Sequence, residues 1–437
     1  MTAYQLIQKK RDGGTLSALE IARFFEGYAR GEIAEYQMAA FLMAVFFRGM
    51  SAPELTALVE TLLHSGAIVD LSSVPGIKVD KHSTGGVGDK VSLVLAPLVA
   101  ALGVPVPMMS GRGLGHSGGT VDKLETIPGF RTALSVDEYR AQLERIGCAL
   151  ISQTDEVAPL DRRLYALRDV TGTVESIPLI ASSIMSKKLA EGIDALVLDV
   201  KLGNGAFMTD PARAEELART MIDIGTAHGK QVVALLTAMD RPLGHAVGNA
   251  LEVEEAVLAL RGEGPADLRE VTLALAAEML VLGGAAAALE AARAAAEAAL
   301  ADGRAAAMFQ RIIEAQGGNP AVVDDPALLP QAPVRAVFAA DRAGTVAVMD
   351  VRAIGHAAVT LGAGRRSLEA PIDPAVGFHI TVRPGQAVAA GEPLATVHAA
   401  DAAAAETGVA ALRAAITIGD AAAPALPLIV QRLTAAR

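Results

Sequence analysis

Two glycine-rich segments of the chain carry the side chains best suited to hold an anion. The first spans residues 81–90 (KHSTGGVGDK) and the second spans residues 110–120 (SGRGLGHSGGT). Glycine lets backbone N–H groups turn toward a ligand, and successive N–H groups in such turns form concave anion sites. Serine and threonine hydroxyls add hydrogen-bond donors, and lysine adds positive charge. Because the two segments have matching chemistry, we expect them to form one phosphate cradle.

The second segment also matches, weakly, the dinucleotide-binding pattern GxGxxG at residues 113–118. That pattern expects an acidic residue about 20 positions further on, closing a second strand, to bind a ribose. Asp137 lies near that distance, but Ser135 and Glu138 have the spacing of a capping box that opens a helix. The P-loop pattern GxxxxGK[ST] does not occur in the chain.

The composition limits the classes of function. The chain has 437 residues, of which 52% are hydrophobic and 20% charged, so a large core is expected. The net charge of -11 argues against a nucleic acid or a membrane surface as partner. An anionic substrate therefore needs a local positive site. The single cysteine, Cys148, excludes an intrachain disulfide, and the N-terminus does not read as a signal peptide, so we expect a cytoplasmic protein.

The elements that must position these residues follow from hydrophobic periodicity. Residues 1–65 have helical spacing, with capping-box patterns starting at Ser17 and Ser51. Residues 38–47 are apolar nearly all round, which is typical of a helix that is central or covered by another subunit. We therefore expect a helical domain that also forms a homodimer.

From about residue 70 the pattern alternates between strand and helix. Short β-rich runs occur at 104–109, 148–152, 195–200 and 231–236, which predicts a parallel sheet flanked by helices. Ligands bind beyond the carboxyl ends of such strands, and both glycine-rich segments follow predicted strands. The uncharged run 91–109 is interrupted by Pro97 and Gly103 and predicts a buried helix followed by a strand, not a membrane span.

Two further regions complete the chain. Residues 155–192 combine serines with basic residues that apolar side chains interrupt, which favours a site facing inward; the basic residues are Arg162, Arg163, Arg168, Lys187 and Lys188. Residues 265–317 are alanine-rich and helical, and short β-like runs return after 335. Residues 382–397 are similar to a lipoyl- or biotinyl-type sandwich. The last lysine is Lys230, so this module is not a lysine-linked carrier.

The segments 81–89 and 110–125 closely resemble the thymidine and pyrimidine-nucleoside phosphorylases, and the second match is long and ungapped. Further matches lie at 165–171 (YALRDVT), 176–180 (SIPLI) and 186–189 (SKKL). The resemblance implies a fold with a small all-helical domain, a large α/β domain and a C-terminal β-rich module. The expected boundaries are 1–68 with 158–192 returning to it, 69–157 with 193–332, and 333–437.

The resemblance also implies a set of site residues. Phosphate is expected among Lys81, Ser83, Ser92, Ser110 and Thr120. The pyrimidine base is expected against His82, Arg168, Ser183 and Lys187, flanked by Leu114 and Phe207. The implied reaction is phosphorolysis of uridine, thymidine or deoxyuridine to free base and (deoxy)ribose 1-phosphate, with inorganic phosphate as co-substrate and no cofactor.

The implied chemistry suits these residue types. Phosphate attacks C1′ of the sugar while the bond to the pyrimidine breaks, and the leaving base carries negative charge. Arg168 and Lys187 can stabilise that charge. His82 can act on the base O2 as a hydrogen-bond donor or as a general acid, two alternatives that the sequence leaves open.

One residue departs from the family pattern. Some pyrimidine-nucleoside phosphorylases hold a monovalent cation with backbone oxygens at Gly88, Leu243 and Ala246, the carboxylate of Glu255, and a hydroxyl at position 90. This chain has Lys90 at that position. We expect its ammonium to take the place of the cation and to pair with Glu255, so that activity does not require potassium.

Other functions stay open from the sequence. A thymidine-only enzyme is the nearest alternative. An anthranilate-type phosphoribosyltransferase shares the expected architecture but needs acidic residues that carry magnesium, and only Asp122 and Glu125 stand nearby. A non-catalytic protein would bind nucleoside without releasing base.

Overall fold

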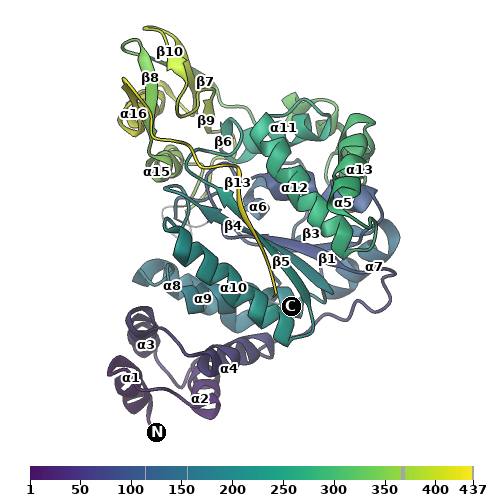
Figure 1. Ribbon diagram of the computed structural model, residues 1–437, viewed down its shortest axis with the longest axis vertical. Coiled ribbons are helices and arrows are strands. Elements are labelled where there is room, and N and C mark those ends of the chain that lie inside the picture. The colour runs from purple at the N-terminus through teal and green to yellow at the C-terminus, as the bar shows by residue number, and fades with distance from the viewer. Residues whose placement is uncertain (114, 155, 366–369, 436–437) are drawn as a thin grey trace.

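The computed structural model describes residues 1–113, 115–154, 156–365 and 370–435. Figure 1 shows a helical part at the N-terminal end, a central sheet covered by helices, and a smaller β-rich module at the opposite end. The small helical domain, the large α/β domain and the β-rich C-terminal module confirm the predicted fold class.

The helical part has an aromatic core. Phe24 lies 4.5 Å from Phe41 between ring centroids, and Phe25 packs edge-on against the same ring. The predicted cap at Ser17 is present, since Ser17 N–H donates to the Glu20 carboxylate (2.8 Å) and Glu20 N–H donates to Ser17 Oγ (3.3 Å). The helices of this part are α1 (Ala3–Arg11), α2 (Ala18–Ala29), α3 (Glu35–Arg48) and α4 (Ala52–Leu63).

Later segments return to this helical part. α8 (Pro159–Thr171) contacts α3 and α4, and α9 (Ile177–Ala190) packs along α4. Leu160, Leu164 and Leu179 are buried in the same hydrophobic cluster as the N-terminal aromatic residues. The expected return of the segment near 160–190 therefore has a physical basis in shared apolar packing.

The central sheet has the strand order β1-β4-β5-β13. Its first three strands are parallel, while the C-terminal strand runs antiparallel beside β5. A second, two-stranded parallel sheet joins β2 to β3. The strands of the two sheets are β1 (Val79–Ser83), β2 (Val106–Ser110), β3 (Cys148–Ser152), β4 (Ala195–Leu202), β5 (Gln231–Ala238) and β13 (Ile429–Thr434).

Helices cover both faces of the central sheet (Figure 1). α9 and α10 lie on one side, and α12 with α13 lies on the other. Besides α8 and α9, the helices of this part are α5 (Val91–Ala101), α6 (Thr120–Leu124), α7 (Val136–Ile146), α10 (Pro211–Ala227), α11 (Asn249–Leu260), α12 (Ala266–Leu282), α13 (Leu289–Ala301) and α14 (Arg304–Ala315). The predicted helix and strand between 91 and 109 are confirmed as α5 and β2, although α5 continues through Pro97 and ends before Gly103.

The C-terminal module holds two small sheets, of order β6-β9-β11-β7 and β10-β8-β12. Two short 3-10 helices, η1 (Pro320–Val323) and η2 (Pro326–Leu328), precede it, and η1 packs on α14. The elements of the module are β7 (Val334–Ala339), β8 (Gly344–Met349), α15 (Val351–Leu361), β9 (Gly377–Ile380), β10 (Ala387–Val388), β11 (Pro393–Ala399), α16 (Ala402–Ala415) and β12 (Ile416–Gly419). β6 (Ala246–Val247) comes from the α/β domain and pairs with β9. The module and the large domain therefore exchange strands, because β13 in turn completes the central sheet.

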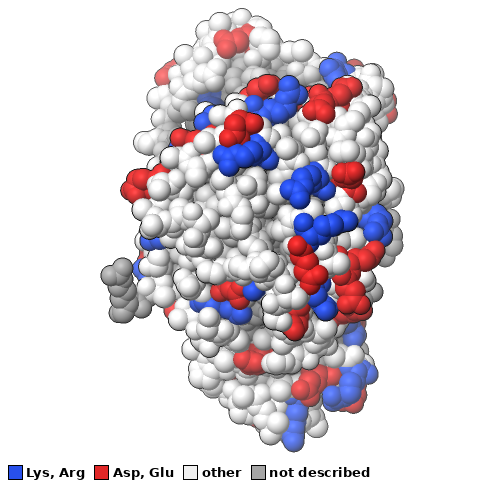
Figure 2. Space-filling view, turned by 90° about the vertical axis from the view of Figure 1, so that its right-hand side faces the viewer, with Lys and Arg blue, Asp and Glu red and all other residues white. Residues whose placement is uncertain are grey.

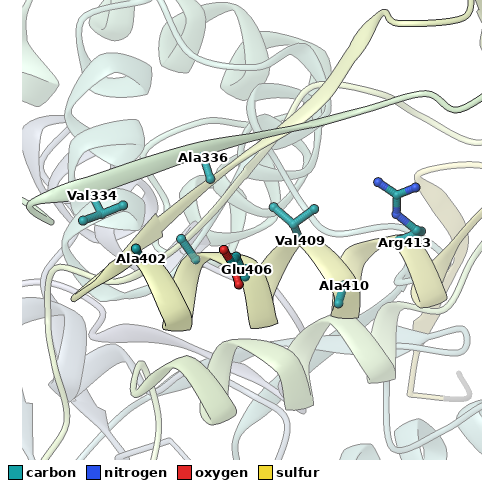
Figure 3. A pocket seen from close by; sticks show the side chains of 8 residues that line it. Val334, Ala336, Ala402, Glu406, Val409, Ala410 and Arg413 are labelled. Carbon is teal, nitrogen blue, oxygen red and sulfur yellow. The ribbon is translucent and has the colours of Figure 1, made fainter.

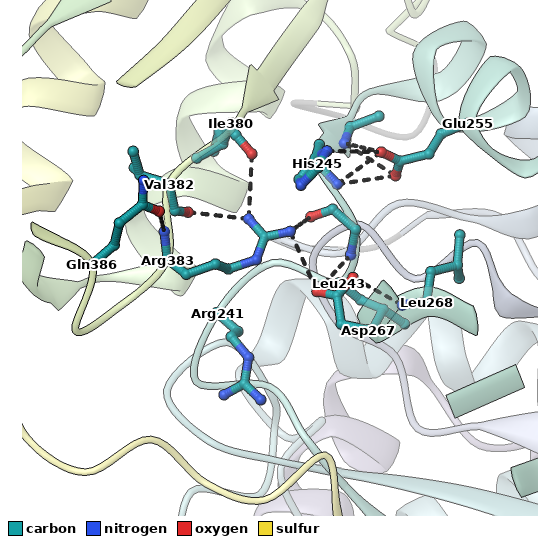
Figure 4. Close-up of polar contacts among 12 residues, drawn as sticks. Arg241, Leu243, His245, Glu255, Asp267, Leu268, Ile380, Val382, Arg383 and Gln386 are labelled. Atoms are coloured by element: carbon teal, nitrogen blue, oxygen red, sulfur yellow. Dashed lines mark hydrogen bonds and ion pairs between the residues drawn. The ribbon is translucent and has the colours of Figure 1, made fainter. Parts of the chain in front are cut away.

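Polar contacts reinforce this junction. Arg383 of the module donates to the carbonyl of Gly244 (2.9 Å) and forms an ion pair with Asp267 (3.3 Å), as Figure 4 shows. On the face drawn in Figure 2, lysine and arginine side chains lie among aspartate and glutamate side chains. Among the helices of the described residues, none is long and apolar enough to cross a membrane.

Candidate active site

A cavity of about 800 Å³ lies where the two glycine-rich segments meet α8 and α9. It opens beyond the carboxyl ends of β1 and β2, where ligands bind in parallel sheets. Most of the expected site residues line it, namely Lys81, His82, Ser83, Ser92, Ser110, Thr120, Ser183, Lys187 and Phe207. The fold thus brings the expected phosphate and base residues to one place.

The first segment turns sharply after β1. Gly85 and Gly88 have φ angles of 89° and 74°, a left-handed region that glycine adopts readily. A Cβ at Gly88 would lie 2.7 Å from the carbonyl oxygen of Leu243, so this position also requires a residue that has no side chain. Ser83 Oγ donates to Asp89 Oδ2 at 2.5 Å, which closes the turn across the loop.

The second segment folds back on itself after β2. A Cβ at Gly119 would come within 2.0 Å of the amide nitrogen of Gly113. Gly113 N–H donates to Asp122 at 2.7 Å, and Arg112 forms ion pairs with Asp122 and Glu125. Arg365 from the C-terminal module also contacts Asp122 at 2.9 Å. The two carboxylates that a magnesium-dependent alternative requires are therefore neutralised by arginines.

The lysine of the first segment is buried but loosely held. Lys81 Nζ donates to Ser92 Oγ at 3.4 Å, a long hydrogen bond, and lies 3.6 Å from Asp199 Oδ2. Only 2% of the residue is exposed, yet it lines the cavity. A buried ammonium with weak partners retains donors for an anion.

His82 lies on β1 and lines the cavity. Burial lowers its pKa well below the ordinary value, and the positive charges of Lys188, Lys187 and Lys81 lower the pKa further. The imidazole is therefore neutral near pH 7 and has one N–H to donate. This state favours the hydrogen-bond donor over the imidazolium general acid among the two roles left open by the sequence.

Lys187 faces the cavity from α9. Its Nζ pairs with Asp161 Oδ2 at 2.5 Å and donates to Ser183 Oγ at 2.9 Å. The same ammonium lies 5.4 Å from the ring centroid of Tyr165, within the range of a cation–π contact. These partners hold a positive charge in the wall of the cavity that α9 forms.

Arg168 does not line the cavity. Its guanidinium is buried and donates to the carbonyls of Thr173 (3.3 Å), Val174 (2.8 Å) and Leu179 (2.9 Å). In this structure the side chain braces the turn between α8 and α9, so its assignment to the base stays a prediction. Leu114 lies outside the described residues.

Sequence reasoning missed four residues that the structure places at or behind the site. Asp161 pairs with Lys187, and Tyr165 lines the cavity between α8 and α9. Asp199 and Lys201 lie beneath the first segment and are fully buried. The sequence does carry a signal for Asp199 and Lys201. They are charged residues at alternate positions of a strand that is otherwise apolar, and an unpaired charge in such a buried strand is costly.

The expected cation site contains an ammonium. Lys90 Nζ donates to the carbonyls of Leu243 (2.7 Å) and Ala246 (3.0 Å) and pairs with Glu255 (2.6 Å). The Glu255 carboxylate also accepts from the N–H groups of His245 and Ala246, as Figure 4 shows. The absence of a potassium requirement remains a prediction.

One nearby group has the donor types of a metal site. Ligand atoms of His245, Glu255 and His379 lie within 4.8 Å of one another. However, Glu255 is paired with Lys90, and the charge of Arg383 acts on His245, whose pKa is lowered by burial and by that charge. Two fixed positive charges beside the group oppose the binding of a further cation.

A second hollow, of about 490 Å³, lies between β7 and α16 in the C-terminal module. Figure 3 shows its largely aliphatic lining, with Glu406 and Arg413 as the charged residues among those that line it. The hollow has few groups able to bind phosphate, in contrast to the cavity beside the glycine-rich segments.

Comparison with known proteins agrees with this architecture. Residues 76–306 match the glycosyl transferase family a/b domain, and residues 4–66 match the helical bundle domain of the same family. Residues 345–419 match the pyrimidine nucleoside phosphorylase C-terminal domain. The fold and site thus define an enzyme of the glycosyltransferase class, built from a helical bundle and an α/β domain.

More specifically, the chain belongs to the pyrimidine-nucleoside phosphorylase family. The pyrimidine-nucleoside phosphorylase of Geobacillus stearothermophilus is 51% identical over 398 residues, covering 91% of this chain and 92% of the relative. The enzyme of the same name from Bacillus subtilis strain 168 is 51% identical over 399 residues, with the same coverage.

The fold is shared more widely. Anthranilate phosphoribosyltransferase from Thermus thermophilus superposes with a TM-score of 0.58, covering 71% of this chain and 99% of that chain. The two sequences are 19% identical, so the likeness concerns the fold alone.

Proposed function

We propose that this chain catalyses the phosphorolysis of pyrimidine nucleosides, with uridine, thymidine and deoxyuridine as substrates. The products are the free base and ribose 1-phosphate or deoxyribose 1-phosphate. The observation that carries the proposal is the single cavity that five expected phosphate residues share with His82, Ser183 and Lys187. Phosphate and nucleoside held in one cavity react as an intramolecular pair, which can supply about 7–11 kcal/mol of the barrier reduction.

The reaction divides between the two sides of the cavity. An oxygen of inorganic phosphate, held by Lys81 and the hydroxyls of the glycine-rich segments, forms a bond to C1′ of the sugar. The glycosidic bond breaks, and its electron pair moves onto the pyrimidine. Lys187 lies on the base side and stabilises the developing negative charge.

Neutral His82 donates its N–H to a carbonyl oxygen of the base in this scheme. Because its pKa is depressed, it stabilises the leaving base by hydrogen bonding and does not carry a positive charge into the ground state. Arg168 is assigned to the base side as well, and reaching the base requires it to release at least one of its three carbonyl partners.

The proposal is tested by product analysis. Purified protein is incubated with uridine, thymidine or deoxyuridine, each with and without inorganic phosphate, and base and sugar 1-phosphate are quantified. We expect base release that requires phosphate and persists in EDTA. Binding of nucleoside without release of base would contradict the proposal, and loss of activity in EDTA would favour the phosphoribosyltransferase alternative. The three rates also separate broad specificity from a thymidine-only enzyme.

We further propose a homodimer that forms through the helical domain. Large apolar side chains are exposed on this domain, with Tyr36 77% exposed and Phe47 74% exposed on α3 and Tyr4 exposed on α1. Aromatic residues are enriched at protein–protein interfaces. Light scattering should give twice the chain mass, and Tyr36→Asp with Phe47→Asp should give the monomer. A monomeric unmodified protein would contradict this proposal.

A further inference from the structure

Four buried charges lie at and behind the wall of the cavity that the first glycine-rich segment forms. Lys81 and Asp89 line the cavity, while Asp199 and Lys201 are fully buried on β4. Lys201 Nζ lies 2.7 Å from Asp199 Oδ2 and 4.0 Å from Asp89 Oδ2. Lys81 Nζ lies 3.6 Å from the same oxygen of Asp199. One carboxylate oxygen thus stands between two lysines.

Strand register explains this placement. β1 and β4 run parallel, with Lys81 opposite Val197 and Ser83 opposite Asp199. Side chains two residues apart in a strand share one face, so Lys81 and Ser83 point the same way, as do Asp199 and Lys201. The alternation places Lys81, Ser83, Asp199 and Lys201 on a common side of the sheet, under the turn that follows β1.

The carboxylate of Asp199 is held in place. Thr237 Oγ1 on β5 donates to Asp199 Oδ1 at 2.5 Å, and the N–H of Lys201 donates to Thr84 Oγ1 at 2.9 Å. The Lys201 ammonium forms an ion pair with Asp199 Oδ2 at 2.7 Å. Attraction between the charges therefore holds Lys201 to this carboxylate.

The electrostatics agree with this pairing. Burial lowers the pKa of Lys201, but Asp199 and Asp89 outweigh that effect and raise the pKa above its ordinary value. Burial raises the pKa of Asp89, but Lys201, Lys81 and Lys123 together lower it well below its usual range. Lys123 itself is paired with Glu252 at 2.7 Å. Lys201 and Asp89 are thus charged near neutral pH.

We propose that Lys201 is a positioning residue for phosphate, because it neutralises Asp199 and so leaves the ammonium of Lys81 free to bind the anion. Without Lys201, Lys81 is the nearest remaining cation to Asp199 and forms a tight pair with it. Lys81 then turns away from the cavity, and the site loses the ammonium that binds phosphate. This inference rests on the proposed function for the identity of the anion.

The test is a pair of single variants and their combination. Binding of inorganic phosphate is measured by calorimetry, and KM values for phosphate and uridine are measured for each protein. For Lys201→Met we expect phosphate affinity to fall about tenfold or more, the effect of losing a charge-assisted hydrogen bond from Lys81, with the KM for uridine nearly unchanged. Lys201→Met combined with Asp199→Asn removes both buried charges and should restore most of the affinity.

Two controls make the result specific. Lys230→Met removes a lysine that precedes β5, at the opposite end of the sheet, and should bind phosphate normally. Asp199→Asn alone leaves Lys81 without a competing carboxylate and should bind phosphate at least as well as the unmodified protein. This second variant decides the question if Lys201→Met does not fold.

Several outcomes would overturn the inference. Equal phosphate affinity in Lys201→Met and the unmodified protein would do so, as would a combined variant no better than the single one. A large loss of phosphate affinity in Asp199→Asn would also do so. Calorimetry separates these failures from failure of the proposed function, because phosphate binding is measured without any nucleoside turnover.

Discussion

Two buried lysines of the first glycine-rich segment, nine positions apart, have opposite surroundings. Lys90 donates to the carbonyls of Leu243 and Ala246 and pairs with Glu255, all at 3.0 Å or less. Lys81 has one long hydrogen bond to Ser92 at 3.4 Å and a carboxylate at 3.6 Å that already has a closer lysine. The two ammonium groups are equally buried but differ in how fully their protons are used.

This difference gives the two lysines different roles. Lys90 is fully coordinated and joins the first segment to the loop before α11, so it acts as an internal cation. Lys81 lines the cavity with donors in reserve, so its proton donors are available to an anion. The contacts of the two ammonium groups, and not their burial, therefore distinguish the two lysines.

The largest expected effect is the loss of Lys81. We expect Lys81→Met to lower kcat/KM for phosphate by about 100-fold to 1000-fold, the range seen when a preorganised donor to developing charge is removed. The free energy of unfolding should equal that of the unmodified protein, because Asp199 keeps its closer partner Lys201. Steady-state kinetics with a parallel thermal melt measures both. A variant with near-normal kinetics would remove Lys81 from the site and break the comparison.

Next come the two cations assigned to the base. Lys187→Ala and Arg168→Ala are both expected to lower kcat/KM by about 100-fold or more. Arg168→Ala should also lower the free energy of unfolding, because three buried carbonyls lose their donor, at about 1–3 kcal/mol for each unsatisfied group. Lys187→Ala should lower it as well, because the buried Asp161 carboxylate loses its ion-pair partner. Urea unfolding beside kinetics measures both properties. Unchanged stability of Arg168→Ala would place Arg168 with the cavity residues and not with the brace.

Lys90→Met should have the opposite effects to Lys81→Met, because it should lower stability and leave phosphate binding unchanged. It leaves Glu255 buried without its partner, so we expect the free energy of unfolding to fall by about 3–5 kcal/mol, while the folded variant keeps its KM for phosphate. Lys90→Thr replaces the ammonium with a hydroxyl, and its melting temperature and activity should rise with potassium but not with sodium. Insensitivity of Lys90→Thr to potassium would show that no cation can substitute for the ammonium.

His82 gives a smaller, pH-dependent effect. Its pKa is lowered in the folded protein, so the unfolded chain binds a proton more readily. The resulting stability is present in full above the ordinary histidine pKa and is lost as the pH falls below it. His82→Gln should show less of this loss in melts recorded across pH. In kinetics, kcat/KM of the unmodified enzyme should lack an inflection near the ordinary histidine pKa, and a titration there would indicate a charged role.

The smallest expected effect is that of potassium on the unmodified enzyme. Because the Lys90 ammonium already contacts Leu243, Ala246 and Glu255, adding potassium chloride to potassium-free buffer should leave the rate unchanged. Sodium chloride at equal ionic strength is the control. A strong increase specific to potassium, with Lys90 intact, would refute the internal-cation interpretation.

Much of the architecture could be predicted from local patterns. The strands at 148–152, 195–200 and 231–236 and the caps at Ser17 and Ser135 were predictable, because strand alternation and capping boxes are short-range signals. The exchange of β6 and β13 between domains was not, because a two-residue strand and a terminal strand carry little pattern of their own. Arg168 shows a similar limit, since a residue type that suits the base can also brace a turn.

By itself, the sequence determined the chemical inventory of the site: two glycine-rich turns with hydroxyls and lysines, each following a strand, in a chain of net negative charge. Only the tertiary structure decided which lysine is neutralised and which is available. The partners of Lys81 and Lys90 lie more than 100 positions away in the chain, at Asp199 and Glu255. Strand order and register create those contacts, and in a buried environment a contact difference of about one ångström determines whether a charge is satisfied.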